Sequence, residues 1–203
     1  MQWLTAGHDE RSRYRAALQQ WLHRSARMRE HDEHLRREAA PWAVGWAGEL
    51  HVARELSGLL ARDNRWRILH SVPVGASGSD IDHVLIGPGG FFTLNAKHHR
   101  NASIWVAGGT FMVNGTRHPY VRNARHEAQR ASRVLSTACG FGVHTQAVIV
   151  PVNARSITIR AAPEVAVISH VALVNWLQRF PDVVPMPVVE RVFAAARRPS
   201  TWR

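Results

Sequence analysis

The chain has 203 residues, and its 26 lysine and arginine residues against 15 acidic residues give a formal net charge of +11. A hydrophobic content of 45% is enough for a packed core, which excludes a chain that is disordered throughout. The single cysteine, Cys139, excludes a disulfide framework and a cysteine-based zinc site, and it is typical of a reducing compartment.

The positive charge has two explanations. A sequence pI near 11.5 favours an anionic partner, with nucleic acid first. Alternatively, the excess is a coding bias, since every basic residue except Lys97 is an arginine. A compact ammonium with a tunable pKa differs chemically from a planar guanidinium. The one lysine is therefore a candidate functional residue, with chance survival as the other interpretation.

The amino-terminal 42 residues are rich in both signs of charge, and we expect them to form a helical extension. A short apolar stripe with helical spacing would pack on the body or on a partner, and it consists of Tyr14, Leu18, Trp21 and Leu22. Contact with a membrane surface or nucleic acid is the alternative for this segment. Pro41 marks its end. No apolar run reaches the roughly 18 residues of a membrane span, and no signal-peptide core is present, so we expect a soluble, cytoplasmic protein.

A second helix is predicted from residue 43 to about 61, because apolar residues recur three and four apart at Val52, Leu56 and Leu59. Glu49 lies on the same stripe, where a carboxylate is costly unless it is paired or bound to a metal. The alternative is a Glu49 at the rim of the stripe that reaches water. Gly48 beside it permits close approach of another backbone.

Three strands are predicted next, over residues 66–74, 80–86 and 91–97, and the turn at 87–90 makes the last two a hairpin. Side chains alternate between the two faces of a strand. Asp80 and Asp82 therefore share one face of the first hairpin strand, with His83 on the other. In the partner strand the residues that share a face are Asn95, Lys97 and His99.

The remaining chain predicts a hairpin of 104–106 and 110–113, a helix over 122–138 and a buried strand over 145–150. Short strands near 157 and over 165–168 follow, and helices over 171–178 and 188–197 complete the chain. The 122–138 helix has a basic face of Arg122, Arg125, Arg130 and Arg133. From their alternation within strands we expect a core that includes Val84, Ile86, Phe92, Leu94, Val148 and Val150.

This order of elements, with its acidic residues and lysine, resembles the NERD (nuclease-related) domain of the PD-(D/E)xK restriction-endonuclease-like superfamily. The resemblance is carried by Gly48-Glu49, by residues 81–84 and 87–92, by residues 95–99 and by residues 122–127. It covers about half of the chain. It implies an α/β fold with a restriction-endonuclease-like core, made of a helix, a three-stranded antiparallel meander, a helix and a strand. We expect that core over residues 43–155, preceded by the 1–42 extension and followed by strands and helices of 156–203 packed on it.

The resemblance also implies a hydrolase that cuts phosphodiester bonds with Mg²⁺ or Mn²⁺. On this sequence Asp82 would be the central metal ligand, Glu49 the helix-borne ligand and Lys97 the charged assistant. Carboxylate oxygens suit a hard divalent cation, which lowers the pKa of a bound water. The lysine would orient that water or offset charge on the phosphate in the transition state.

One position departs from the family pattern. The acidic residue two before the lysine is Asn95 here, whose amide oxygen is a ligand without formal charge. Asp80 is a candidate to compensate for it; alternatively, the site has lost hydrolysis and kept binding. His83, His98 and His99 lie near the proposed centre, but His98 and His99 point to opposite faces and cannot easily share one ion. His126 and Glu127 on the later helix could line the pocket.

Three functions are compatible with these patterns. The first is a metal-dependent nuclease, or nuclease-like DNA-processing protein, that uses Glu49, Asp82, Asn95 and Lys97. The second is a nucleic-acid-binding module without hydrolysis, in which Arg122, Arg125 and Arg130 contact phosphates. The third is a protein-interaction domain with a purely genomic arginine excess. Metal-dependent cleavage of plasmid DNA, and binding that weakens steeply with salt, separate the three.

Overall fold

The computed structural model describes residues 41–75 and 79–203. The chain divides into two compact units, Met1–Ala43 and Val44–Arg203. The extension expected over residues 1–42, including its stripe from Tyr14 to Leu22, lies outside the described residues up to residue 40. None of the described helices is both long and apolar enough to cross a membrane.

The described elements follow the order that the sequence predicts. The first half contains α3 (Pro41–Arg62), β1 (Arg67–Val74), β2 (Ser79–Gly87), β3 (Gly90–His98), β4 (Ser103–Ala107), β5 (Thr110–Val113) and β6 (Thr116–His118). The second half contains α4 (Tyr120–Cys139), β7 (Thr145–Val152), β8 (Ser156–Ile159), β9 (Ala166–Val167), η1 (His170–Ala172), α5 (Leu173–Leu177), α6 (Met186–Ala196) and η2 (Pro199–Trp202). The mixed α/β class is confirmed, and the elements are consistent with a restriction-endonuclease-like core, with β4, β5 and β6 inserted between its third strand and its second helix.

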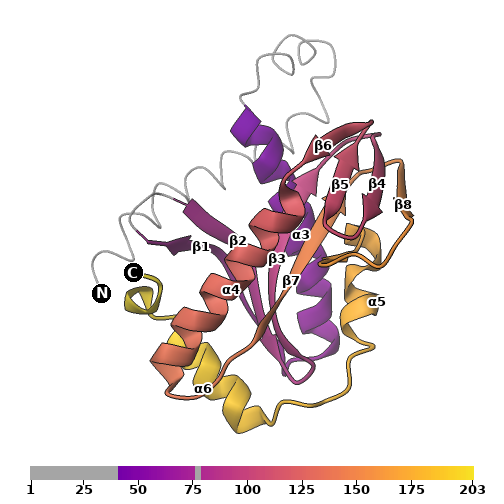
Figure 1. The fold of residues 1–203 in the computed structure, drawn as a ribbon. Helices are drawn as coiled ribbons and strands as arrows, with labels where there is room; N and C mark the ends of the chain where they lie inside the picture. The colour runs from indigo at the N-terminus through magenta and orange to yellow at the C-terminus, as the bar shows by residue number, and fades with distance from the viewer. Residues whose placement is uncertain (1–40, 76–78) are drawn as a thin grey trace. The chain divides into compact units, whose positions relative to one another are not determined.

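A five-stranded mixed sheet in the order β1-β2-β3-β7-β9 is the centre of this unit (Figure 1). β1 pairs antiparallel with β2, and β2 pairs antiparallel with β3, as in a meander. β7 then pairs parallel with β3 from Phe91↔Thr145 to His98↔Val152. The crossover between these two parallel strands contains α4, as a parallel pair needs a long connection.

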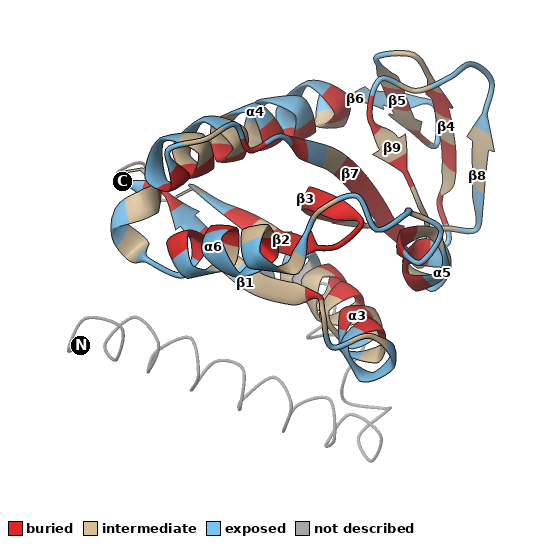
Figure 2. Ribbon diagram, turned by 90° about the horizontal axis from the view of Figure 1, so that it is seen from below, coloured by how far each residue is buried: buried red, intermediate tan, exposed pale blue. Residues whose placement is uncertain are grey.

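Helices cover both faces of this sheet. α3 and α5 pack on one face, where Val52, Leu56 and Leu173 meet Phe92 and Leu94. α4 and α6 pack on the other face, where their buried side chains meet Val84, Ile86 and Phe91. The buried residues of α4 and α6 lie toward the sheet in Figure 2, and exposed ones point outward. The six core residues expected from the sequence, Val84, Ile86, Phe92, Leu94, Val148 and Val150, are all 0% exposed.

A second, four-stranded sheet has the order β6-β5-β4-β8 and lies beside the first turns of α4 (Figure 1). Ile104, Val106 and Phe111 of this sheet share a buried cluster with Val121 and Ala124 of α4. The segment after residue 155 contributes strands to both sheets, β8 to this one and β9 to the larger one. Residues distant in sequence thereby complete both layers.

The tight β2–β3 turn depends on a tryptophan that packs over it. A Cβ atom built on Gly87 would lie 2.3 Å from Cε3 of Trp66, far inside van der Waals contact. Gly90 has a φ of +128°, a conformation that L side chains rarely adopt. The Gly-Pro-Gly-Gly sequence at 87–90 therefore serves the packing of the turn as well as its backbone shape.

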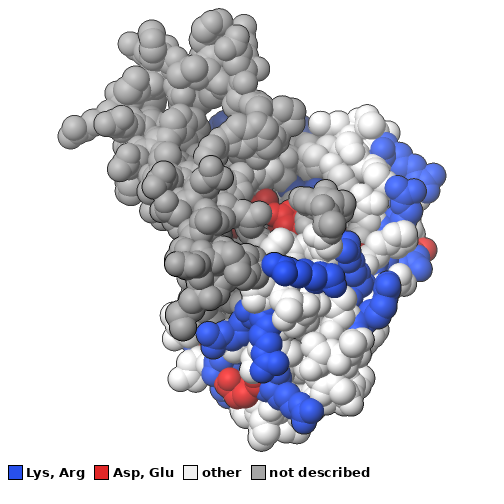
Figure 3. Space-filling view, turned by 90° about the vertical axis from the view of Figure 1, so that its left-hand side faces the viewer, with Lys and Arg blue, Asp and Glu red and all other residues white. Residues whose placement is uncertain are grey.

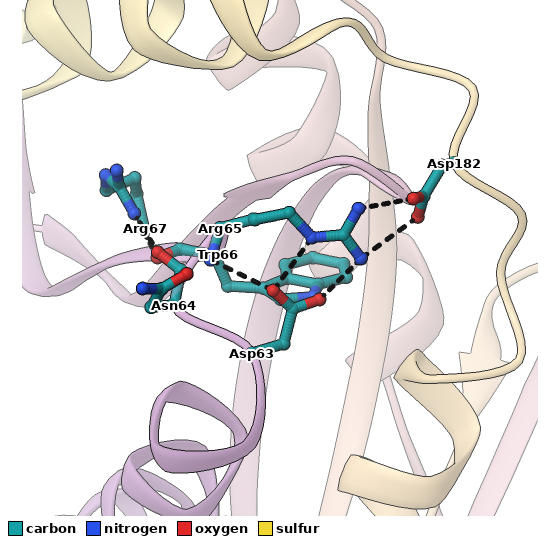
Figure 4. Close-up of polar contacts among 6 residues, drawn as sticks. All are labelled: Asp63, Asn64, Arg65, Trp66, Arg67 and Asp182. Carbon is teal, nitrogen blue, oxygen red and sulfur yellow. Dashed lines mark hydrogen bonds and ion pairs between the residues drawn. The ribbon is translucent and has the colours of Figure 1, made fainter.

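The corner between α3 and β1 is linked to the loop before α6 by charged side chains (Figure 4). Arg65 forms an ion pair with Asp63 at 2.9 Å and a second one with Asp182. Arg67 forms an ion pair with Glu190 of α6. These pairs are partly exposed, so each contributes little to stability. Arg65 and Arg67 connect neighbouring segments of the fold.

Candidate active site

The site begins where β2 and β3 part. Their backbone pairing runs from Gly87↔Gly90 to His83↔Leu94 and stops there. One residue further, the Asp82 carboxylate accepts a hydrogen bond from the Ala96 N–H at 2.7 Å. The side chain thus satisfies a backbone donor that the β2–β3 ladder does not reach. This bond holds the Asp82 carboxylate at the opening between the two strands.

Asn95 faces the same side of the sheet as Asp82 and meets a carboxylate from α4. Its Nδ2 donates to both oxygens of Glu127, at 2.8 and 2.9 Å. Asn95 is 7% exposed, and its Oδ1 is buried with no hydrogen-bond partner. A buried carbonyl oxygen without a donor is uncommon in folded proteins, so this atom is available to a cation or a water.

Lys97 lies two residues along β3, on the same face as Asn95. Its Nζ lies 5.2 Å from the ring centroid of Tyr120, a cation–π contact at the first residue of α4. The positive charge of Lys97 is close enough to lower the pKa of both Asp82 and Glu127. The structure therefore brings together three of the four predicted catalytic residues, Asp82, Asn95 and Lys97.

Burial raises the pKa of the two carboxyl groups. Desolvation is the largest cause for Asp82 and raises its pKa to about 6, against the opposing effects of Lys97 and the Ala96 N–H. Desolvation also raises the pKa of Glu127, against the Asn95 hydrogen bond and Lys97. The negative charge of Asp80 raises the pKa of both groups further. Asp80, expected to compensate for Asn95, therefore acts electrostatically on the same site.

The fourth predicted residue, Glu49, approaches from the opposite layer. It lies on α3, whose buried residues pack on the other face of the sheet from Asp82 and Asn95. Gly48 brings this helix close to the end of β3, because a Cβ atom at Gly48 would lie 3.0 Å from the Cβ of His98. The close approach expected at Gly48 is confirmed, and the partner is β3 one residue beyond Lys97.

The histidines near the centre belong to separate clusters. His98 Nε2 lies 3.1 Å from Nδ2 of Asn153, and its ring is near that of His51 of α3. His99 lies beside Tyr120, on the Lys97 face. The prediction that His98 and His99 point to opposite faces is confirmed. His83 forms a 2.8 Å hydrogen bond with His70 of β1.

The basic side chains of α4 divide between its two edges. Arg125 forms an ion pair with Glu164 at 2.5 Å, on the side of the helix toward the smaller sheet. Arg130 lies against the end of β1, because a Cβ atom at Gly75 would lie 2.2 Å from the Arg130 guanidinium. Arg122 is exposed. On the face drawn in Figure 3, several groups of basic side chains are spread over the described surface, with a few small acidic patches among them.

Oxygen donors at this site suit a hard cation. No group of three or more His, Cys, Asp or Glu side chains that could hold a metal ion occurs among the described residues. Mg²⁺, however, keeps several waters and is commonly bound through one or two carboxylates. Asp82 and the unpartnered Oδ1 of Asn95 provide a carboxylate and an amide oxygen on one face, so the residues fit magnesium better than an ion that needs a full protein cage.

Glu127 is the site residue whose role the sequence did not define. The sequence suggested only that it could line the pocket, because it lies on the helix that follows the lysine strand. A carboxylate on a helix with an otherwise basic and apolar pattern is a weak signal. Its pairing with Asn95, 32 residues earlier, depends on the packing of α4 against the sheet.

Comparison with known proteins gives one family. The model of the nuclease-related domain (NERD) matches residues 44–152, more than half of the 203 residues. The matched segment runs from the first turn of α3 to the end of β7, and it contains Glu49, Asp82, Asn95, Lys97 and Glu127. No curated protein and no solved structure matches the chain significantly.

Proposed function

The chain belongs to the nuclease-related domain family, and from this membership we propose that it is a divalent-metal-dependent nuclease, or nuclease-like DNA-processing protein, that hydrolyses phosphodiester bonds. One observation carries the proposal. Asp82, Asn95 and Lys97 lie on one face of the sheet where β2 and β3 part, with the carboxylate of Glu127 against Asn95. Carboxylate, amide and ammonium groups in one place are the side chains that metal-assisted phosphoryl chemistry needs.

In this proposal Asp82 and Asn95 hold Mg²⁺ or Mn²⁺ through oxygen atoms, with Glu49 as the ligand from α3. A divalent cation bound there would polarise the scissile phosphate and lower the pKa of a bound water. Asp82 must be ionised to bind it, and the Ala96 N–H favours that state by donating to the carboxylate. The same hydrogen bond fixes the orientation of the Asp82 carboxylate, so the ligand is preorganised.

Lys97 stabilises negative charge that develops on the phosphate oxygens in the transition state. Its ammonium lies 5.2 Å from the centroid of the Tyr120 ring and is close enough to Asp82 and Glu127 to lower the pKa of both. These neighbours restrict where the flexible side chain places its charge. A fixed charge needs no reorganisation during the reaction, which is the main advantage of such groups.

We propose DNA as the polymer that the site acts on, with Arg122, Arg125 and Arg130 of α4 as phosphate contacts. The net charge of +11 supports a polyanionic partner. Arg130 lies against Gly75, close to the start of the strand that carries Asp80 and Asp82. Arg125 is already paired with Glu164, so a phosphate contact through it requires exchange of that partner.

A second candidate function is a nucleic-acid-binding module that does not cut. Asn95 favours it, because this position lacks the formal charge that a third carboxylate would bring to the cation. The same basic residues would then bind the backbone while the site remains a weak metal site. Salt-sensitive binding of DNA without cleavage would support this candidate.

A plasmid assay with Mg²⁺ and with Mn²⁺ tests the first proposal. We expect the wild type to nick or linearise plasmid DNA, and EDTA to stop it. Lys97→Arg keeps the charge on a longer, planar group, so cleavage should fall by roughly 10²-fold or more. DNA binding measured by fluorescence anisotropy should change little.

Two outcomes would contradict this expectation. Equal cleavage by the wild type and Lys97→Arg would remove Lys97 from the mechanism. Absence of cleavage with either metal, together with DNA binding that falls steeply with salt, would favour the binding module.

A further inference from the structure

Glu127 is the side chain that the proposed mechanism does not use, although it has well-defined partners. Both of its oxygens accept from Nδ2 of Asn95, at 2.8 and 2.9 Å. It reaches this position from α4, while Asp82 comes from β2 and Asn95 from β3. The Asn95 amide therefore links β3 to α4, on the face of the sheet that also carries Asp82.

This contact determines which way the Asn95 amide points. A carboxylate can only accept, so the NH₂ group must face Glu127 and the carbonyl oxygen must face away from it. That oxygen, Oδ1, is buried and has no hydrogen-bond partner, and Asn95 as a whole is 7% exposed. A buried acceptor without a partner costs free energy, which a bound cation would recover.

We propose that Asn95 and Glu127 together replace the carboxylate that the family pattern places two residues before the lysine. Oδ1 of Asn95 is the ligand atom, and Glu127 is a positioning residue that holds the amide and supplies the missing negative charge. With the proposed ligands Asp82 and Glu49, Glu127 then gives the site three negative charges, the number that a carboxylate at position 95 would have given it. This inference rests on the proposed metal-dependent function.

The pairing changes what a carboxylate at position 95 would do. On the sequence alone, Asn95→Asp should tighten magnesium binding, with Lys97 keeping the new carboxylate ionised. The structure adds Glu127 within hydrogen-bond distance of that side chain. Two carboxylates so close repel each other, so the single substitution introduces a charge conflict along with a ligand.

The exchange of the two groups avoids this conflict and provides the test. Asn95→Asp combined with Glu127→Gln keeps one carboxylate, one amide and a hydrogen bond between them. Glu127→Gln alone keeps the hydrogen bond, since the glutamine oxygen accepts from Asn95, but removes the charge. Glu164→Gln is the matched control. It makes the same change of side chain and charge at the carboxylate that pairs with Arg125, outside the proposed metal site.

The measurements are Mn²⁺ binding by electron paramagnetic resonance and Mg²⁺ binding by calorimetry, with unfolding temperatures in EDTA. We expect Glu127→Gln to weaken binding by about 10-fold or more, the range typical of changing a residue that supports a metal ligand, because the negative charge near the cation is lost. The exchanged double variant should regain at least the wild-type affinity, and Glu164→Gln should match the wild type. In EDTA all variants should remain folded, so that a lost affinity reports on the site itself.

The outcomes separate this inference from the proposed function. If the wild type binds metal and Glu127→Gln binds equally well, Glu127 has no part in the site. If the folded double variant binds no better than Glu127→Gln, the charge exchange is refuted and the metal-dependent function stands. If the wild type binds neither Mg²⁺ nor Mn²⁺, both the function and this inference are overturned.

Discussion

At the scale of the residue, the pKa of Asp82 indicates that this carboxyl group does not stabilise the fold and has another role. Burial raises its pKa, while Lys97 and the Ala96 N–H act in the other direction and only partly offset it. A carboxyl group with a raised pKa reduces the stability of the folded state whenever it is ionised. Strongly shifted groups of this kind are concentrated at functional sites.

The pH dependence of unfolding should show this effect. Between about pH 4 and the folded-state pKa of about 6, the folded protein holds a proton that the unfolded chain has released. The free energy of unfolding of the metal-free protein should therefore fall as pH rises through that window. Asp82→Asn lacks the ionisable group and keeps an acceptor for Ala96. We expect it to be more stable than the wild type at pH 7 by roughly 1–3 kcal/mol.

Urea unfolding in EDTA at pH 4, 5, 6 and 7 measures this difference. The comparison of variant and wild type cancels the contributions of the histidines, which both proteins share. A stability difference that is constant across these pH values would show that Asp82 does not titrate differently in the two states.

At the scale of the element, the position of α3 depends on a single small residue. Gly48 lies close against His98, since a Cβ atom would come to 3.0 Å from the His98 Cβ, a contact that only a small shift of α3 or β3 would relieve. Glu49 follows immediately, so the docking of this turn also sets the distance of Glu49 from the end of β3. Further along the same helix, Gly58 has no atom within 4 Å of an added Cβ.

These two glycines make a matched pair of substitutions in α3. Gly58→Ala should raise the free energy of unfolding by roughly 0.5–1 kcal/mol, because alanine loses less backbone entropy in a helix. Gly48→Ala gains the same propensity but must push α3 away from β3, at a cost of about 1–3 kcal/mol typical of overpacking. Thermal and urea unfolding check the signs. Equal stabilisation by both substitutions would show that the contact at Gly48 is not tight.

At the scale of the whole molecule, the positive charge is best assessed by how binding responds to salt. Each phosphate neutralised by a lysine or arginine contributes close to one unit to the slope of log K against log salt concentration. If the arginine excess is general and no nucleic-acid-binding surface exists, no single arginine substitution should change that slope more than another. The two edges of α4 offer a direct comparison.

Arg130→Gln should weaken DNA binding and lower the magnitude of the salt slope by about 1, the effect of one lost phosphate contact. Arg125→Gln should change the slope less, because Arg125 is paired with Glu164. Fluorescence anisotropy titrations over a range of salt concentrations measure both. Slopes that change equally for the two variants would show that total charge, and not position on α4, governs binding.

The identity of the main elements could be predicted from local patterns. Alternation in the strands and three-and-four spacing in α3 and α4 depend on neighbours in sequence, so they indicated the strands, the helices and the core residues such as Phe92 and Val148. The shared face of Asn95 and Lys97 follows from the same period of two. The resemblance to the nuclease-related domain then added expected roles for Asp82 and Lys97.

Contacts between distant segments could not be predicted in this way, because they depend on how layers pack. The Asp82 carboxylate bonds the Ala96 N–H only because β2 and β3 part beyond His83↔Leu94. Arg125 and Arg130 look equivalent along the helix, yet one pairs with Glu164 and the other lies against Gly75. Glu127 contacts Asn95 because α4 crosses the sheet over that part of β3. No local sequence pattern indicates where a helix crosses a sheet.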